Sequence, residues 1–260
     1  TINSLGLDVD GTIIDYQGGL EDLKKKLVKA VGNPRERIQE DALRIIRMLR
    51  FAAKFGFDIE PETKDAIKEL GHMLFRDEND PSKTGVSAER LHDELFKMAE
   101  SGGPALADFL DKLDEHGLLD KFLPEVKAMQ GVQHQPEPGT YELMPTGKYP
   151  EGKHTFYGHD KFGVEVFQKI ANRLKFSNDE KNAISFVIQN HMKPYKAAEM
   201  KPSKLLSLKN SPYWDEIQEV LYADIHSRGT EGEFAKGPQD YEDILHHFHS
   251  RTQGLGNRDE

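Results

Sequence analysis

The sequence contains no cysteine and no long run of apolar residues. Without cysteine, the chain cannot form a disulfide framework, a thiolate zinc site or a cysteine nucleophile. No apolar run approaches the roughly 20 residues that a membrane helix needs, and the first residues lack the pattern of a signal peptide. These absences favour a reducing, cytoplasmic setting with no insertion into a membrane.

Acidic residues outnumber basic ones, with 45 Asp and Glu against 35 Lys and Arg, so the 260-residue chain has a net charge of −10. This excludes a uniformly basic coat for nucleic acid, although not local basic patches. Residues 33–56 carry six positive and three negative charges. Residues 191–210 also have a positive balance, which suits either contact with an RNA backbone or an ordinary solvated face. Their basic residues are Lys193, Lys196, Lys201, Lys204 and Lys209.

A short hairpin followed almost entirely by helices is the predicted order of elements, so the expected fold class is mainly α. Residues 1–15 partly alternate between apolar and polar, and Asp10-Gly11 favours a hairpin turn. Because two strands alone are marginally stable in water, we expect this hairpin to belong to a sheet whose other strands precede Thr1. Apolar residues at helical spacing predict one long helix over residues 37–55, ending at Gly56.

Five segments are expected along the chain. Residues 1–32 would be the end of a preceding domain and 33–130 a helical region, while 131–153 are rich in Pro and Gly and predict a linker. Residues 154–230 would be a second helical domain, and 231–260 a tail. Helices in the second half are expected over residues 160–175, 179–192, 202–209, 212–227 and 238–250.

One motif offers the hydrogen-bonding groups that could read a base, and it runs Glu40-Asp41-x-x-Arg44-x-x-Arg47-x-x-Arg50-Phe51. Arginines three apart lie on one side of a helix. Asp41 accepts hydrogen bonds and Arg44 donates them, so together they could pair with the edge of a nucleobase. The alternative is a solvated helix face with internal ion pairs.

A second motif is Asp15-x-x-Gly18-Gly19-x-x-Asp22. Two glycines allow the backbone to turn tightly or to approach a phosphate closely, and Asp22 could cap a helix or pair with a basic residue. An ordinary turn explains the same pattern.

These motifs, in this order with Thr1-Ile2-Asn3-Ser4-Leu5 before them and Arg90-x-x-x-Glu94 after them, resemble the bacterial-type (class II) tRNA nucleotidyltransferase and poly(A) polymerase family, which includes the CCA-adding enzymes. The resemblance implies the end of a nucleotidyltransferase head, a nucleotide-selecting neck and an RNA-binding body. Its motifs are shared by enzymes that add CCA, CC, A or a poly(A) tail.

The resemblance also implies roles for individual residues. Asp41 and Arg44 would select CTP and ATP with Arg47 and Arg50 beside them, and the partner would be the acceptor end of tRNA. Supporting roles would fall to Asp15, Gly18, Gly19, Asp22, Arg90 and Glu94. The family's Gly-Ser motif and its Asp-x-Asp pair, which binds Mg²⁺, precede the matching region and are absent from this sequence. Asp8-Val9-Asp10 imitates that pair but adjoins the hairpin turn.

Residues 154–230 contain a further group of metal-ligand types, namely His159, His191 and Asp224. His191 and Asp224 follow the apolar stripes of their helices, which suits a metal site or a pair of hydrogen-bonded core groups. Their surroundings resemble the later motifs of the HD phosphohydrolase domain that some bacterial CCA-adding enzymes carry. The helices for its first ligands are replaced by the Pro/Gly-rich segment, so a degenerate HD domain is expected. Two other functions remain open here, a non-catalytic tRNA-binding module and a metal-dependent phosphohydrolase.

The purified chain is expected to incorporate neither CTP nor ATP into tRNA, because its sequence lacks the Asp-x-Asp motif of the resembled family. Incubation with radiolabelled nucleotide, Mg²⁺ and a tRNA that lacks its 3′ end tests this. Incorporation that depends on Mg²⁺ would contradict the expectation and point to Asp8 and Asp10.

Overall fold

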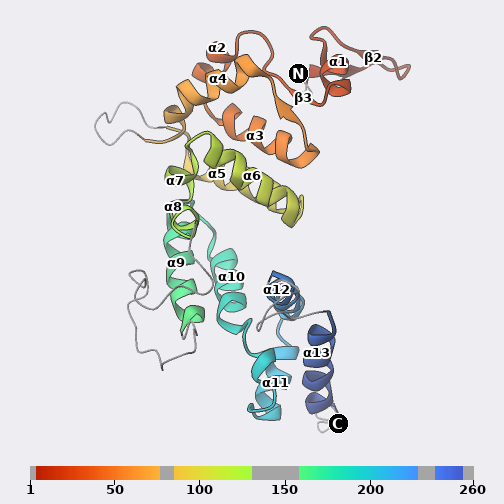
Figure 1. The fold of residues 1–260 in the computed structure, drawn as a ribbon, viewed down its shortest axis with the longest axis vertical. Helices are drawn as coiled ribbons and strands as arrows, with labels where there is room; N and C mark the ends of the chain where they lie inside the picture. Colours follow the sequence, from red (N-terminus) through yellow and green to blue (C-terminus); the bar gives the residue numbers. More distant parts are fainter. Residues whose placement is uncertain (1–3, 77–84, 131–157, 228–237, 254–260) are drawn as a thin grey trace. The chain divides into compact units, whose positions relative to one another are not determined.

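The computed structural model describes residues 4–76, 85–130, 158–227 and 238–253, and the chain divides into two compact units. The first unit is Thr1–Met144 with Arg173–Lys175, and the second is Pro145–Asn172 with Phe176–Glu260. Helices dominate both (Figure 1), which confirms the mainly α fold class. The expected linker, residues 131–153, lies outside the described residues.

The first unit combines two short strand pairs with a series of helices. In chain order its elements are β1 (Gly6–Leu7), β2 (Ile13–Ile14), α1 (Gly19–Lys24), β3 (Leu27–Val28), α2 (Pro34–Glu40), α3 (Leu43–Phe55), β4 (Asp58–Ile59), α4 (Pro61–Leu70), the 3-10 helix η2 (Gly71–Leu74), α5 (Ala88–Ala99), α6 (Gly103–Glu115), α7 (Leu119–Phe122) and α8 (Pro124–Lys127).

The expected N-terminal hairpin is present, with β1 antiparallel to β2 and Gly6 opposite Ile14. Each strand has only two residues, because Asp8–Thr12 form the connecting loop. A second pair joins β3 and β4 in parallel, with Leu27 opposite Asp58. Sequence alternation did not predict this pair, since two residues are too few for a period to be seen.

The single helix predicted over residues 37–55 is wrong, because α2 ends at Glu40 and α3 begins at Leu43. Between them Asp41 has an extended backbone, with φ −155° and ψ 102°. Its side chain accepts a hydrogen bond from the Leu43 amide at 3.1 Å. Aspartate competes with the helical backbone in this way, so the chain turns at Asp41 before α3 begins. The end of α3 at Gly56, with φ 62°, is as predicted.

Helix α3 is the centre of the first unit. It packs against α5 and α6 on one side and contacts β3 and β4. Seven of its apolar side chains are buried, while Arg44, Arg47 and Lys54 remain exposed. The buried residues are Leu43, Ile45, Ile46, Met48, Leu49, Ala52 and Ala53. Burial of this stripe fixes which face of α3 points outward.

The second unit is helical throughout its described residues. Its elements are α9 (His159–Arg173, of which Arg173 belongs to the first unit), α10 (Asn178–Asn190), the 3-10 helix η3 (Pro194–Lys196), α11 (Pro202–Lys209), α12 (Trp214–Ser227) and α13 (Pro238–Thr252). All five helices predicted for this half are confirmed to within two residues at each end.

Packing in the second unit gathers α11, α12 and α13 around one apolar core that includes Leu205, Leu221 and Phe248. Arg251 ties the end of α13 to the segment after η3, donating to the carbonyl oxygens of Ala197 at 2.7 Å and Met200 at 2.9 Å. The residues that we expected to form a tail therefore contribute a packed helix. In the described ranges, no helix has the length and hydropathy needed to cross a membrane.

Candidate functional site

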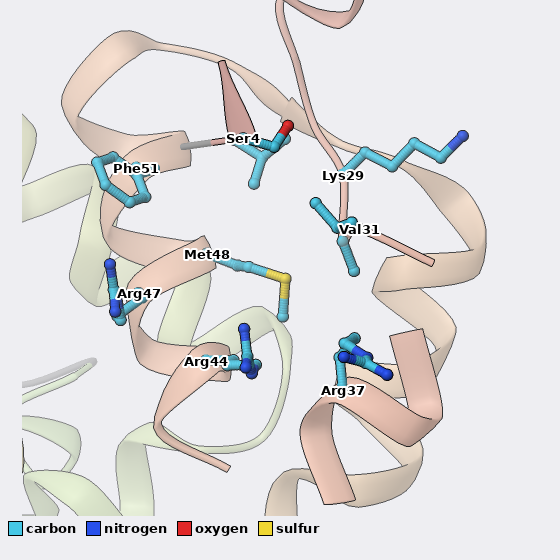
Figure 2. Close-up of a pocket in the computed structure, with 10 residues that line it drawn as sticks. Ser4, Lys29, Val31, Arg37, Arg44, Arg47, Met48 and Phe51 are labelled. Atoms are coloured by element: carbon cyan, nitrogen blue, oxygen red, sulfur yellow. The ribbon is translucent and has the colours of Figure 1, made fainter. Parts of the chain in front are cut away.

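A pocket of about 220 Å³ lies in the first unit, between α3 and the segment that follows β3 (Figure 2). Its lining is apolar and basic, with no Asp or Glu. It consists of Ser4, Val28, Lys29, Ala30, Val31, Arg37, Arg44, Arg47, Met48 and Phe51. Figure 2 shows four of these residues on α3 and Arg37 on α2, while the Lys29 amino group points away from the labelled arginines. Such a cavity suits an anionic ligand with a flat apolar part.

Glu40 holds two arginines of this pocket. Its carboxylate lies 2.9 Å from Nη2 of Arg37 and 3.8 Å from Nη2 of Arg44. Nε of Arg37 is buried and has no hydrogen-bond partner among the described residues. A buried donor without a partner is costly, which favours an acceptor in the pocket. Sequence analysis gave Glu40 no role of its own, although its spacing of three and four residues from the arginines was the available signal.

Asp41 lies beside the pocket lining and is held by two hydrogen bonds. Oδ1 accepts from the Leu43 amide, and Oδ2 accepts from Nη2 of Arg90 at 2.7 Å. Partial burial alone would raise the pKa of the Asp41 carboxyl, but these bonds and the charges of Arg90 and Arg44 lower it below its ordinary value. Asp41 is therefore ionised at neutral pH. The bond to Asp41 also raises the pKa of Arg90.

Arg50 is buried within the first unit and does not line the pocket. Its Nε donates to Oε2 of Glu94 at 2.7 Å, and the two residues are only 7% and 4% exposed. Lys97 donates to the other oxygen of Glu94 at 3.1 Å. Burial alone would raise the pKa of Glu94, but the bonds from Arg50 and Lys97 lower it. We expected Arg50 beside a bound nucleotide, but its guanidinium instead forms an ion pair with Glu94 that joins α3 to α5.

Arg90 and Glu94 stand one turn apart on α5 and contact the two ends of the arginine motif. Arg90 reaches Asp41 ahead of α3, and Glu94 reaches Arg50 in its last turns. Residues four apart on a helix share a face, so one face of α5 supports both groups. Both residues therefore support the arginine motif from α5.

The glycine motif forms the start of α1. Asp15 accepts from the amides of Gly19 and Leu20, each at 2.9 Å, and these bonds lower its pKa, that from Leu20 most. Gly18 has φ 74°, a backbone that a side chain would strain. Asp22 lies in the first helical turn, where its negative charge is favourable. The motif builds a helix start in the described structure.

The carboxylates of Asp8 and Asp10 hold the hairpin loop. Asp8 accepts from the Val9 amide at 2.7 Å and Asp10 from the Thr12 amide at 2.9 Å. Among the described residues, no group of three or more His, Cys, Asp or Glu could hold a metal ion. Both carboxylates thus accept hydrogen bonds within their own loop.

In the second unit, the structure brings two of the three expected metal ligands together. Nε2 of His159 lies 3.3 Å from Nε2 of His191. Nδ1 of His191 lies 2.6 Å from the Ile188 carbonyl, which only a protonated nitrogen can approach as a donor. Asp224 instead accepts from the Tyr195 hydroxyl at 2.8 Å. The described residues thus show a histidine pair with Asp224 bonded elsewhere.

Known proteins match the sequence of this chain in both units. Residues 56–130 match the family model described as "Probable RNA and SrmB- binding site of polymerase A". A CCA-adding enzyme from Lactobacillus johnsonii is 43% identical over 113 residues, which is 43% of this chain and 26% of that protein. A multifunctional CCA protein from Actinobacillus pleuropneumoniae is 30% identical over 251 residues, covering 81% of this chain and 57% of that protein. The chain thus spans between about a quarter and just over half of these relatives' lengths.

A similar fold occurs in a crystal structure of the Bacillus stearothermophilus CCA-adding enzyme in complex with CTP. The two structures have a TM-score of 0.52 and 17% sequence identity. The match covers 98% of this chain and 68% of that one. At this identity, the likeness concerns the fold alone.

Replacing Arg50 with Met is expected to destabilise the protein by about 3–5 kcal/mol, because the Glu94 carboxylate stays buried with Lys97 as its remaining cation. The control is Arg35→Met, which breaks an exposed ion pair with Glu69 and should change the stability little. Urea unfolding at pH 7 compares them. Because the folded pKa of Glu94 is lowered, the stability that the pair contributes is present above the ordinary pKa of 4.5 and disappears as the pH falls through the folded pKa. Equal losses in both variants would contradict the assignment.

Proposed function

We propose that the first unit selects CTP or ATP during addition to the 3′ end of tRNA. The chain belongs to the family of CCA-adding enzymes. The pocket between α3 and the segment that follows β3, with Arg37 and Arg44 held by Glu40, is the observation that carries this proposal. Its arginines would bind the phosphates and the base edge of a nucleotide, while Met48 and Phe51 give it an apolar wall. A volume of about 220 Å³ is below the ~300–1,000 Å³ of pockets for whole drug-sized ligands, so part of the nucleotide would remain outside.

Selection would rest on donors and acceptors held in place before the nucleotide arrives. Arg44 donates only, and the ionised Asp41 accepts only, so a base with the wrong edge leaves one of them unpaired. Asp41 already accepts from Arg90 and Leu43, which fixes its carboxylate in the absence of ligand. Arg47, exposed at the pocket, would contact phosphate. Mg²⁺ would assist the transfer itself through carboxylates other than Asp8 and Asp10.

Contact with tRNA would involve basic residues of both units. The matched RNA-binding family region covers residues 56–130. In the second unit, five lysines between residues 193 and 209 are all exposed, so they could contribute phosphate contacts. Because the chain has no cysteine and its exposed lysines could contact RNA, we propose that it acts in the cytoplasm.

Replacing Arg44 with Ala is expected to reduce discrimination more than affinity. Loss of one base-edge partner should lower the preference for CTP and ATP over UTP and GTP by about 1–3 kcal/mol. Titration calorimetry of the four nucleotides with the purified chain measures this, with Asp41→Ala as a second variant and Arg35→Ala as an arginine outside the pocket lining. Unchanged selectivity in both Asp41→Ala and Arg44→Ala would overturn the proposed site.

A second function, metal-dependent phosphoester hydrolysis by residues 154–230, draws on the contact between His159 and His191. Their 3.3 Å separation is about that of two nitrogen ligands on a tetrahedral zinc ion. A hydrolytic site needs further protein ligands and an open position for water, and the described residues supply no group of three. We therefore propose that this domain is degenerate and contributes packing and RNA contact.

His191→Ala is expected to lower the free energy of unfolding by about 1–3 kcal/mol, since the contacts of His191 with the Ile188 carbonyl and with His159 are lost. Thermal unfolding measures this, with the exposed His247 replaced by Ala as the control. The chain should also fail to hydrolyse 2′,3′-cyclic phosphates with added divalent metals. Hydrolysis that disappears in His191→Ala would show an active phosphohydrolase site.

A further inference from the structure

Helix α3 extends the pocket surface beyond the residues that line it. Phe51 follows Arg47 by four residues, and Lys54 and Phe55 follow Phe51 by three and four, so all of them lie on the side of α3 that Phe51 occupies. Arg47 and Phe51 line the pocket, whereas Lys54 and Phe55 lie one turn further along the helix. The same face therefore continues out of the pocket toward the end of α3.

Aromatic groups on this face stack in a row that starts at a buried cation. The Arg50 guanidinium lies 4.6 Å from the centre of the Phe51 ring. The Phe51 and Phe55 rings are nearly parallel, with 6.0 Å between their centres and 5° between their planes. Phe57 contacts Phe55 at a tilt, and Phe55 is still 46% exposed. A single exposed apolar residue needs no explanation, but this ring is the exposed member of an ordered row of aromatic rings.

The charge of α3 favours an anionic partner for this row. Residues 43–55 contain four basic and no acidic side chains. Two of these cations are engaged, Arg50 by Glu94 and Arg44 by Glu40. Arg47 and Lys54 form no ion pair with the described residues, and the Lys54 ammonium lies 5.8 Å from the centre of the Phe55 ring.

Given the proposed function, we infer that Phe55 is a stacking platform for an unpaired base at the 3′ end of the RNA, with Lys54 contacting the adjoining phosphate. An aromatic face next to a lysine is the combination that binds single-stranded nucleic acid, because every base has a π-face and every nucleotide a negative charge. Phe55 would thus position the RNA end beside the pocket where Phe51 meets the incoming nucleotide.

Binding of short RNAs by the full chain tests this inference. A hairpin RNA with an unpaired 3′ end and the same hairpin with a blunt end are titrated by fluorescence anisotropy over a range of salt. Phe55→Ala should weaken binding of the first RNA about 5- to 150-fold and remove its advantage over the blunt hairpin. Phe55→Trp should restore both. Lys54→Ala should lower the magnitude of the salt slope by about 0.7, whereas Phe55→Ala leaves that slope unchanged.

Tyr16→Ala is the matched control, because Tyr16 is an exposed aromatic residue of the same unit that is not part of α3. It should bind both RNAs as the unaltered chain does. With 5-iodouridine at the RNA 3′ end, irradiation should crosslink Phe55. The inference is overturned if Phe55→Ala binds the unpaired RNA normally, or if Tyr16→Ala weakens binding equally. If the unaltered chain binds neither RNA nor nucleotides, the proposed function itself is wrong.

Discussion

The buried ion pair between Arg50 and Glu94 is the constraint on which the candidate site depends. Two charges removed from water remain favourable only when each meets its partner with good geometry. The pair therefore permits few rotations or shifts of α3 against α5. Because α3 also carries Arg44, Arg47 and Phe51, this contact, together with the buried apolar stripe of α3, sets the position of the pocket wall.

The break at Asp41 gives the two neighbouring acids different partners. Glu40 ends α2 and faces the pocket arginines, while Asp41 turns to Arg90 on α5. In an uninterrupted helix, consecutive residues would point about 100° apart around one axis and could not be placed independently. The extended residue between α2 and α3 instead separates the two carboxylates. The Glu40 carboxylate orients Arg37 and Arg44, and the Asp41 carboxylate is held beside the pocket by Arg90.

Much of the fold was predictable from the sequence because helical periodicity over ten or more residues is a strong signal. The helices of the second unit and the end of α3 at Gly56 follow from it. The break at Asp41 did not, since apolar spacing continues across it from Ile38 to Leu43 and onward. The hydrogen bond from the Leu43 amide to the Asp41 side chain determines the local structure there, and hydrophobic periodicity does not reveal such a bond.

The sequence indicated which residues belong to the candidate site better than it indicated which side chains they contact. Charge spacing along residues 37–50 located the basic face, and the family resemblance gave Arg90 and Glu94 supporting roles. That Arg50 turns inward could not be seen, because its partner lies 44 residues away and both side chains are of types that are usually exposed. Lining residues such as Met48 and Val31 look like ordinary core residues in a sequence, since only the fold shows that they border a cavity.

Net charge and local charge act in opposite directions in this protein. A chain of net charge −10 repels nucleotides and RNA at a distance, and salt weakens that repulsion over about 8–10 Å. At short range, Arg44, Arg47 and Lys54 are exposed on α3, a helix that contains no acid, so an anion that reaches this face of α3 is attracted. Non-specific adsorption elsewhere is thereby disfavoured. The net negative charge thus sharpens the preference for the basic face of α3, which packs against α5 through the buried Arg50–Glu94 pair.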